Sequence, residues 1–145
     1  MDHLKKELAK CLHTEEVIDS LPNGLDEQIG TFNGTARELS GGQWQKVSIM
    51  RAAYRNNTNI MILDEPTAAL DPMAETQLYR DFEKITGDRT SLLISHRLGI
   101  TSVVQRILVF KEGRLIEEGT HEKLMKEKGY YATLYQAQAQ RYQNN

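Results

Sequence analysis

Residues 60–66 read Ile-Met-Ile-Leu-Asp-Glu-Pro, a run of four apolar side chains that ends in two carboxylates and a proline. A short apolar run of this kind is typical of a fully buried strand in a parallel sheet. Ligands of open parallel sheets bind beyond the carboxyl ends of the strands. We therefore expect a strand over residues 60–63, with Asp64 and Glu65 at the edge where a ligand would bind.

Further strands follow along the chain. Residues 91–95 (Ser-Leu-Leu-Ile-Ser) predict a second buried strand that stops at His96. Residues 107–110 predict a third strand, which a Glu-Gly turn reverses into a hairpin with residues 114–117. The order strand, helix, strand, loop, strand predicts an α/β fold with a parallel sheet.

Helix signals separate and flank these strands. Asp71 and Pro72 supply a cap and a first-turn proline for a helix that we expect to run to Gly87. Its predicted apolar face consists of Leu78, Phe82 and Ile85. Residues 40–43 (Ser-Gly-Gly-Gln) fit a capping box at the start of an earlier helix. Near the end of the chain we expect Thr120 to cap a short helix, followed by a last helix over residues 130–142.

The first thirty residues predict helix, turn, helix and loop. Thr14 is expected to cap the second helix, Pro-Asn-Gly at residues 22–24 to stop it, and residues 30–38 to form a loop. The apolar face of the first helix is marked by Leu4, Leu8, Cys11 and Leu12.

Composition is that of a soluble globular chain. The 145 residues carry 18 basic and 20 acidic side chains, a net charge of −2, which points to neither a nucleic-acid surface nor a polybasic membrane anchor. No stretch approaches the roughly 18 consecutive apolar residues that cross a bilayer. Cys11 is the single cysteine, so an internal disulfide is impossible. We expect its thiol to pack rather than react.

Acidic side chains and a histidine at strand ends suit phosphate chemistry. Either Asp64 or Glu65 can hold Mg²⁺, directly or through water, while the other orients and deprotonates an attacking water. His96 can donate a hydrogen bond to a transferring phosphoryl oxygen. Taken singly, each has a plainer reading, because such carboxylates are more often caps or turn residues and a lone histidine is usually structural.

Residues 39–43 (Leu-Ser-Gly-Gly-Gln) add an element that suits phosphate binding. Two glycines let the backbone approach an anion closely, and the amides and dipole of a helix start attract phosphate. Ser40 adds a hydroxyl donor. The alternative is a plain capped helix with a glycine-rich first turn. A chance match to all five specified residues would occur about once in a million positions of unrelated sequence, which disfavours that alternative.

The order and spacing of these segments resemble those of the ATP-binding cassette (ABC) ATPases over roughly residues 20–142. The corresponding motifs are LSGGQ (residues 39–43), Walker B with its following glutamate (residues 60–65), the D-loop (residues 69–71) and the switch histidine (His96). Residues 116–135 resemble the end of an exporter-type nucleotide-binding domain. The resemblance implies a partial P-loop NTPase (RecA-like) core over residues 59–145. Residues 1–58 would be the part of the ABC helical subdomain that ends in the LSGGQ helix.

The resemblance implies roles for three residues at the chain's own nucleotide site. Asp64 would coordinate Mg²⁺, and Glu65 would be the general base for water. His96 would sense or polarise the γ-phosphate of ATP.

Other residues would act across a head-to-tail dimer, as the resemblance implies. Ser40 and Gly42 would contact the γ-phosphate of ATP held by the opposite subunit, with Gly41 beside them in the nucleotide-binding motif. Gln43 would support that motif and its helix. Asp71 would cross the interface and couple the two ATP sites.

The sequence also departs from the family pattern. No GxxxxGK[ST] motif and no Gly-Lys pair occurs, although that Walker A loop supplies the amides and the lysine that hold the β- and γ-phosphates. The adenine-stacking aromatic residue and the glutamine loop are missing too. We expect all of these to lie upstream of Met1.

The leading hypothesis is the C-terminal part of the ATP-hydrolysing subunit of an ABC exporter. Its partners would be a second nucleotide-binding domain and a transmembrane domain, at the cytoplasmic face of the cell membrane, and the isolated chain would be inactive. An alternative is a catalytically incomplete module that caps the nucleotide site of a partner cassette. A chromosome-maintenance or DNA-repair ATPase is disfavoured because no long heptad pattern lies near the LSGGQ segment and the charge is nearly neutral.

Overall fold

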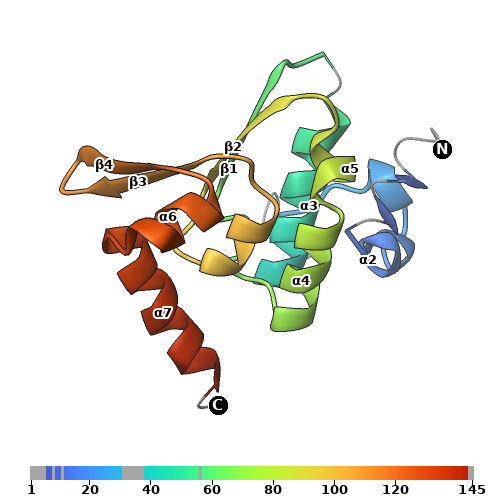
Figure 1. The fold of residues 1–145 in the computed structure, drawn as a ribbon. Helices are drawn as coiled ribbons and strands as arrows, with labels where there is room; N and C mark the ends of the chain where they lie inside the picture. The colour runs from blue at the N-terminus through green and yellow to red at the C-terminus, as the bar shows by residue number, and fades with distance from the viewer. Residues whose placement is uncertain (1–5, 8, 11, 31–37, 56, 144–145) are drawn as a thin grey trace. The chain divides into compact units, whose positions relative to one another are not determined.

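Among the residues that the structure describes, two parallel strands form the sheet of the first part of the chain (Figure 1). The computed structural model describes residues 6–7, 9–10, 12–30, 38–55 and 57–143, with side chains up to residue 140. Strand β1 (Ile60–Asp64) pairs in parallel with β2 (Thr90–Ile94), so that Asp64 lies opposite Ile94. The predicted strands and their parallel pairing are confirmed.

The expectation that these strands are fully buried is wrong for alternate residues. Met61 and Leu63 are buried, at 4% and 7% exposure, whereas Ile60 and Ile62 are 62% and 61% exposed. The exposed residues in β2 alternate in the same way. Successive side chains of a strand point to opposite faces, and within the described residues only one face of the pair is covered. A continuous apolar run therefore does not show by itself that both faces are buried.

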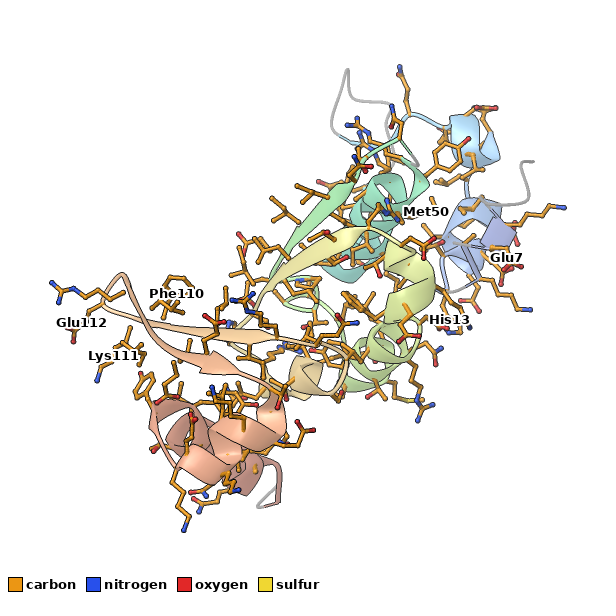
Figure 2. All side chains as sticks on the ribbon, turned by 45° about the horizontal axis from the view of Figure 1, so that its top comes forward. Glu7, His13, Met50, Phe110, Lys111 and Glu112 are labelled. Atoms are coloured by element: carbon orange, nitrogen blue, oxygen red, sulfur yellow. The ribbon has the colours of Figure 1, made fainter. Side chains whose placement is uncertain are left out.

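The third predicted strand pairs with its hairpin partner. Strand β3 (Ile107–Lys111) is antiparallel to β4 (Arg114–Gly119), and among the described residues the two make a separate sheet from β1 and β2. Glu112 and Gly113 both have positive φ, at 49° and 73°, as in a type I′ hairpin turn. The hairpin is thus confirmed. Phe110, Lys111 and Glu112 project from its tip (Figure 2).

Helix α3 (Gly41–Tyr54) packs against β1 and α5 (Figure 1). Helices α4 (Pro72–Arg80) and α5 (Phe82–Thr86) connect the two strands. The single helix expected from residue 71 to Gly87 is in fact broken at Asp81, whose carboxylate accepts hydrogen bonds from the Gln77 and Lys84 side chains. Gly87 ends α5 as expected, with φ of 59°.

Near the N-terminus lie α2 (Glu15–Asp19) and the 3₁₀ turn η1 (Gly24–Asp26). Thr14 occupies the cap position of α2, but its side chain makes no cap hydrogen bond, contrary to expectation. The Thr14 side chain is fully buried. Its hydroxyl instead donates to the Ala9 carbonyl oxygen at 3.3 Å and to Met50 Sδ at 3.6 Å, which are the acceptors that surround it in the interior. Met50 is labelled in Figure 2. The expectations for Leu4, Leu8, Cys11 and the loop over 31–37 lie outside the described residues.

The chain divides into two compact units, residues 1–95 and 96–145. The second holds the hairpin with η3 (Leu98–Ser102), α6 (His121–Glu127) and α7 (Tyr130–Gln143), and its core includes Val109, Leu124 and Tyr131. Thr120 caps α6 by accepting from the Lys123 N–H at 3.3 Å, which confirms the expected cap. The boundary after residue 58, expected for the family's subdomains, falls inside the first unit and stays a prediction.

Candidate functional site

The start of α3 is a complete capping box. Ser40 Oγ accepts from the Gln43 N–H at 3.3 Å, and Gln43 Oε1 accepts from the Ser40 N–H at 2.9 Å. Because Ser40 Oγ accepts here, its hydroxyl hydrogen can still be donated to an anion. Ser40 and Gly41 are exposed, so the hydroxyl and the positive end of the helix dipole are accessible to a phosphate.

Gly42 has a steric role that the sequence does not show. A Cβ atom at this position would lie 2.9 Å from the carbonyl oxygen of Ala69, whereas a Cβ at Gly41 would make an ordinary 3.8 Å contact with Ala69 Cβ. The helix start therefore packs directly on the backbone of the segment that leads from β1 to α4. The segments predicted as LSGGQ motif and D-loop are in contact within one chain.

Asp64 and Glu65 end β1 in different environments. Asp64 is exposed, whereas Glu65 is half-buried and adopts a positive φ of 45°, which is uncommon outside glycine. The Glu65 N–H donates to the Ile94 carbonyl oxygen at 2.8 Å. The Glu65 carbonyl oxygen accepts from the Ala68 N–H at 3.1 Å and from Gln45 Nε2 at 2.9 Å. The backbone of the proposed general base is thus held from β2, from its own turn and from α3.

A buried polar network supports the turn after Glu65. Thr67 is fully buried, and its hydroxyl lies 3.4 Å from the hydroxyl of Tyr79, which in turn donates to Glu75 Oε1 at 2.6 Å. Glu75 is also buried. These bonds connect the turn to α4 and stabilise the path of the chain between β1 and Asp71.

Asp71 is a helix cap in this structure. Its Oδ1 accepts from the Met73 N–H at 2.9 Å and from the Ala74 N–H at 3.0 Å, as expected for the residue before Pro72. The hydrogen bond from Ala74 is the main cause that lowers the pKa of Asp71 below its usual value. An exposed carboxylate of this kind stays ionised at neutral pH, which suits the proposed role at an interface.

His96 follows β2 and belongs to the second unit. Its side chain is exposed, and its backbone carbonyl oxygen accepts from Gln138 Nε2 at 2.5 Å. The structure therefore brings together the start of α3, Glu65 and Ala69 inside the first unit. His96 belongs to the second unit.

The acidic residues suit Mg²⁺ only in part. Within the described ranges, no group of three or more His, Cys, Asp and Glu side chains could enclose a metal ion. Mg²⁺ at phosphate sites is commonly held by one or two carboxylates together with substrate phosphates and water. The exposed carboxylate of Asp64 fits that arrangement, with the remaining ligands coming from outside the chain.

Sequence reasoning missed Gln45 altogether, and it named Ala69 only as part of the D-loop. Gln45 is half-buried on α3 and contacts Glu65 through its side chain, and Ala69 contacts Gly42 through its backbone. The only signal of Gln45 in the sequence is that it lies two residues after the LSGGQ motif, whereas Ala69 is the first residue of the D-loop.

Comparisons with known proteins bear on the family of the whole chain. A family model described as ABC transporter matches residues 5–68. The ATP-dependent lipid A-core flippase of Shewanella oneidensis is 43% identical over 132 residues, which are 91% of this chain and 21% of the flippase. The flippase of Desulfotalea psychrophila is 43% identical over 130 residues, 90% of this chain and 22% of that protein. The chain thus spans about one fifth of the length of these relatives.

A solved structure of a bacterial Atm1-family ABC exporter with ATP bound matches with a TM-score of 0.77 and 33% identity. The match covers 96% of this chain and 24% of that exporter chain. The fold, the motifs and these comparisons place the chain in the ABC transporter ATPases. More narrowly, it is a partial ATPase domain of the exporter type, similar to those of lipid A-core flippases. In the part of the chain that is described, no helix is both long and apolar enough to span a bilayer.

Proposed function

We propose that the chain is the C-terminal part of the ATP-hydrolysing domain of an ABC exporter and couples ATP hydrolysis to export. The observation that carries the proposal is the contact, inside one compact unit, of the capped start of α3 with the segment that follows β1. In that contact Gln45 bonds to Glu65, and Gly42 packs on Ala69. Identity of 43% to ATP-dependent lipid A-core flippases supports it and favours a lipid as the transported class.

The residues divide the chemistry between two ATP molecules. At the chain's own site, Glu65 accepts a proton from the attacking water, Asp64 supplies a ligand to Mg²⁺, and His96 donates a hydrogen bond to the γ-phosphate. The ion supplies charge neutralisation at the phosphates when bound. The Walker A loop that holds this ATP would come from the upstream part of the domain.

At the second site, the start of α3 binds ATP held by an opposite, head-to-tail subunit. The Ser40 hydroxyl and the exposed amide end of the helix contact the γ-phosphate. Gly41 and Gly42 allow the close approach, and Gln43 closes the capping box that holds Ser40 in place. Asp71 lies at the same interface and couples the two sites, and a transmembrane domain completes the transporter.

A chimera tests the proposal. The corresponding C-terminal segment of the Shewanella oneidensis flippase is replaced by this chain, and Mg-ATP turnover is measured in lipid vesicles. We expect turnover in the chimera and a loss of about 10²–10⁴-fold in Glu65→Gln, because a general base contributes that much. Glu83→Gln, an exposed glutamate on α5, is the matched control and should keep full turnover. Full turnover in Glu65→Gln would remove Glu65 from its role.

A second candidate function is a module that caps the nucleotide site of a complete partner cassette without hydrolysis of its own. It is favoured by the complete and exposed helix start at Ser40 and Gly41. ATP-dependent association of the 145-residue chain with a full cassette, measured by light scattering, would support it. Absence of pairing at micromolar concentration with and without ATP would contradict it.

A further inference from the structure

Gln45 connects α3, the helix that Ser40 caps, to the backbone of Glu65. Its Nε2 donates to the Glu65 carbonyl oxygen at 2.9 Å, although the two residues are far apart in sequence. Gln45 lies in the second turn of α3 and is half-buried. Its contact is therefore made at the packed side of the helix and not by a mobile surface side chain.

Glu65 needs external support for its backbone. A φ of 45° is a left-handed conformation that residues with a Cβ rarely adopt, and it persists only where the surroundings hold it. The bond from the Glu65 N–H to Ile94 holds the residue on the β2 side, and the bond from Gln45 holds its carbonyl oxygen on the α3 side. The orientation of this peptide determines the direction in which the Glu65 side chain leaves the backbone.

We propose that Gln45 is a positioning residue for ATP hydrolysis, which acts by holding the Glu65 peptide in its left-handed conformation. The inference rests on the proposed role of Glu65 as general base. Because Ser40 caps the same helix, Gln45 also makes the start of α3 and Glu65 move as one body. In the proposed dimer, the helix start contacts ATP of the opposite subunit while Glu65 acts on ATP of its own. Gln45 thereby links the two ATP sites through one subunit.

The first experiment measures the conformation of Glu65 in the 145-residue chain. Hydrogen exchange of backbone amides is recorded for the parent chain, Gln45→Met and Gln45→Lys. Methionine has a similar shape without a donor, whereas lysine restores a donor of sufficient reach. We expect the Glu65 and Ala68 amides to exchange about tenfold faster in Gln45→Met and near the parent rate in Gln45→Lys. Unchanged exchange in Gln45→Met would overturn the inference.

The second experiment measures turnover in the flippase chimera. We expect Gln45→Met to lower kcat about tenfold and to change the KM for ATP less than about twofold, because a misplaced base slows the chemical step and leaves ATP binding intact. Gln45→Lys should recover most of kcat. Ser48→Ala, which removes an exposed hydroxyl bonded to Trp44 within the same helix, is the control and should behave like the parent.

The outcomes separate this inference from the proposed function. If Glu65→Gln abolishes turnover and Gln45→Met does not lower kcat, Gln45 has no positioning role. If Glu65→Gln leaves turnover intact, the proposed function itself fails, and the inference fails with it. A fall in thermal stability in both Gln45 variants, with kcat and KM changed in parallel and no recovery by lysine, would show a packing role and overturn the inference.

Discussion

The position that a Cβ atom of Gly42 would occupy lies 2.9 Å from the carbonyl oxygen of Ala69. That separation is shorter than Cβ atoms adopt in folded proteins, and the neighbour is backbone, which cannot rotate away. The first turn of α3 and the turn after β1 therefore fit together only when residue 42 is glycine. The requirement is steric and exists without any bound nucleotide.

Gly42→Ala is expected to destabilise the chain by about 1–3 kcal/mol, because the added methyl forces α3 or the Ala69 backbone to shift. The measurement is the midpoint of urea unfolding. Gly41→Ala is the matched control, since its Cβ would meet Ala69 Cβ at 3.8 Å. It should be close to neutral. Equal stability of both variants would show that the backbone after β1 shifts to accommodate the added methyl group without loss of stability.

Arg89 is expected to stabilise the ends of two helices. Its guanidinium donates to the carbonyl oxygens of Ile85 and Thr86 at 2.7 Å each, and to those of Ala52 and Arg55 at 3.3 and 3.4 Å. Arg89→Met should lower the free energy of unfolding by about 1–3 kcal/mol, because the partly buried carbonyl groups lose a charged donor.

Arg89→Lys and Arg80→Met are the control variants for Arg89→Met. Arg89→Lys should recover only part of the loss, since an ammonium group is a point donor and cannot reach two helix ends at once. Arg80→Met, at an exposed position on α4, should cost little. A full recovery by lysine in thermal unfolding would contradict the proposed bridging of α3 and α5.

Asp81 is expected to make the first unit sensitive to acid. Burial raises the pKa of its carboxyl, but the hydrogen bonds from Lys84 and Gln77 outweigh burial, so the folded-state pKa is lowered. A depressed carboxyl pKa contributes stability that is fully present above the unfolded-state value of about 3.9 and is lost as the pH falls through the folded-state value. Stability should therefore decrease on acidification below roughly pH 5.

Asp81→Asn removes this titration. Its stability at neutral pH should be lower than that of the parent, and the difference between the two should shrink towards pH 3 or so. Circular dichroism during urea unfolding at a series of pH values measures both quantities. A difference that stays constant over this range would mean that Asp81 titrates alike in the folded and unfolded chain.

Glu117 is expected to hold the start of α7. Its Oε1 and Oε2 accept from the Tyr130 and Tyr131 N–H groups at 2.5 and 2.9 Å, and Gly129 leaves the space that this carboxylate occupies. Glu117→Ala should destabilise the second unit by about 0.5–2 kcal/mol, as loss of a helix cap does. Glu118→Ala removes only an exposed ion pair with Arg106 and should cost less than about 1 kcal/mol. Hydrogen exchange at the first amides of α7 distinguishes the two, and equal protection in both variants would contradict the cap.

The sequence by itself determined the elements whose signals are local. The Ser40–Gln43 capping box, the cap at Asp71 before Pro72 and the hairpin turn at residues 112–113 depend on residues a few positions apart. Such bonds form within a single turn of chain, so spacing and residue type suffice to predict them. The family resemblance followed from the order and spacing of the LSGGQ, Walker B, D-loop and His96 segments.

Only the tertiary structure decided how the segments meet. The bond between Gln45 and Glu65, and the contact of Gly42 with Ala69, join residues distant in sequence through the packing of α3 beside β1. Exposure of Ile60 depends likewise on which face of the strand pair is covered, and residue type is the same in either case. The local sequence pattern does not predict these contacts. The atoms are brought together by the path of the folded chain and not by the spacing of residues along the sequence.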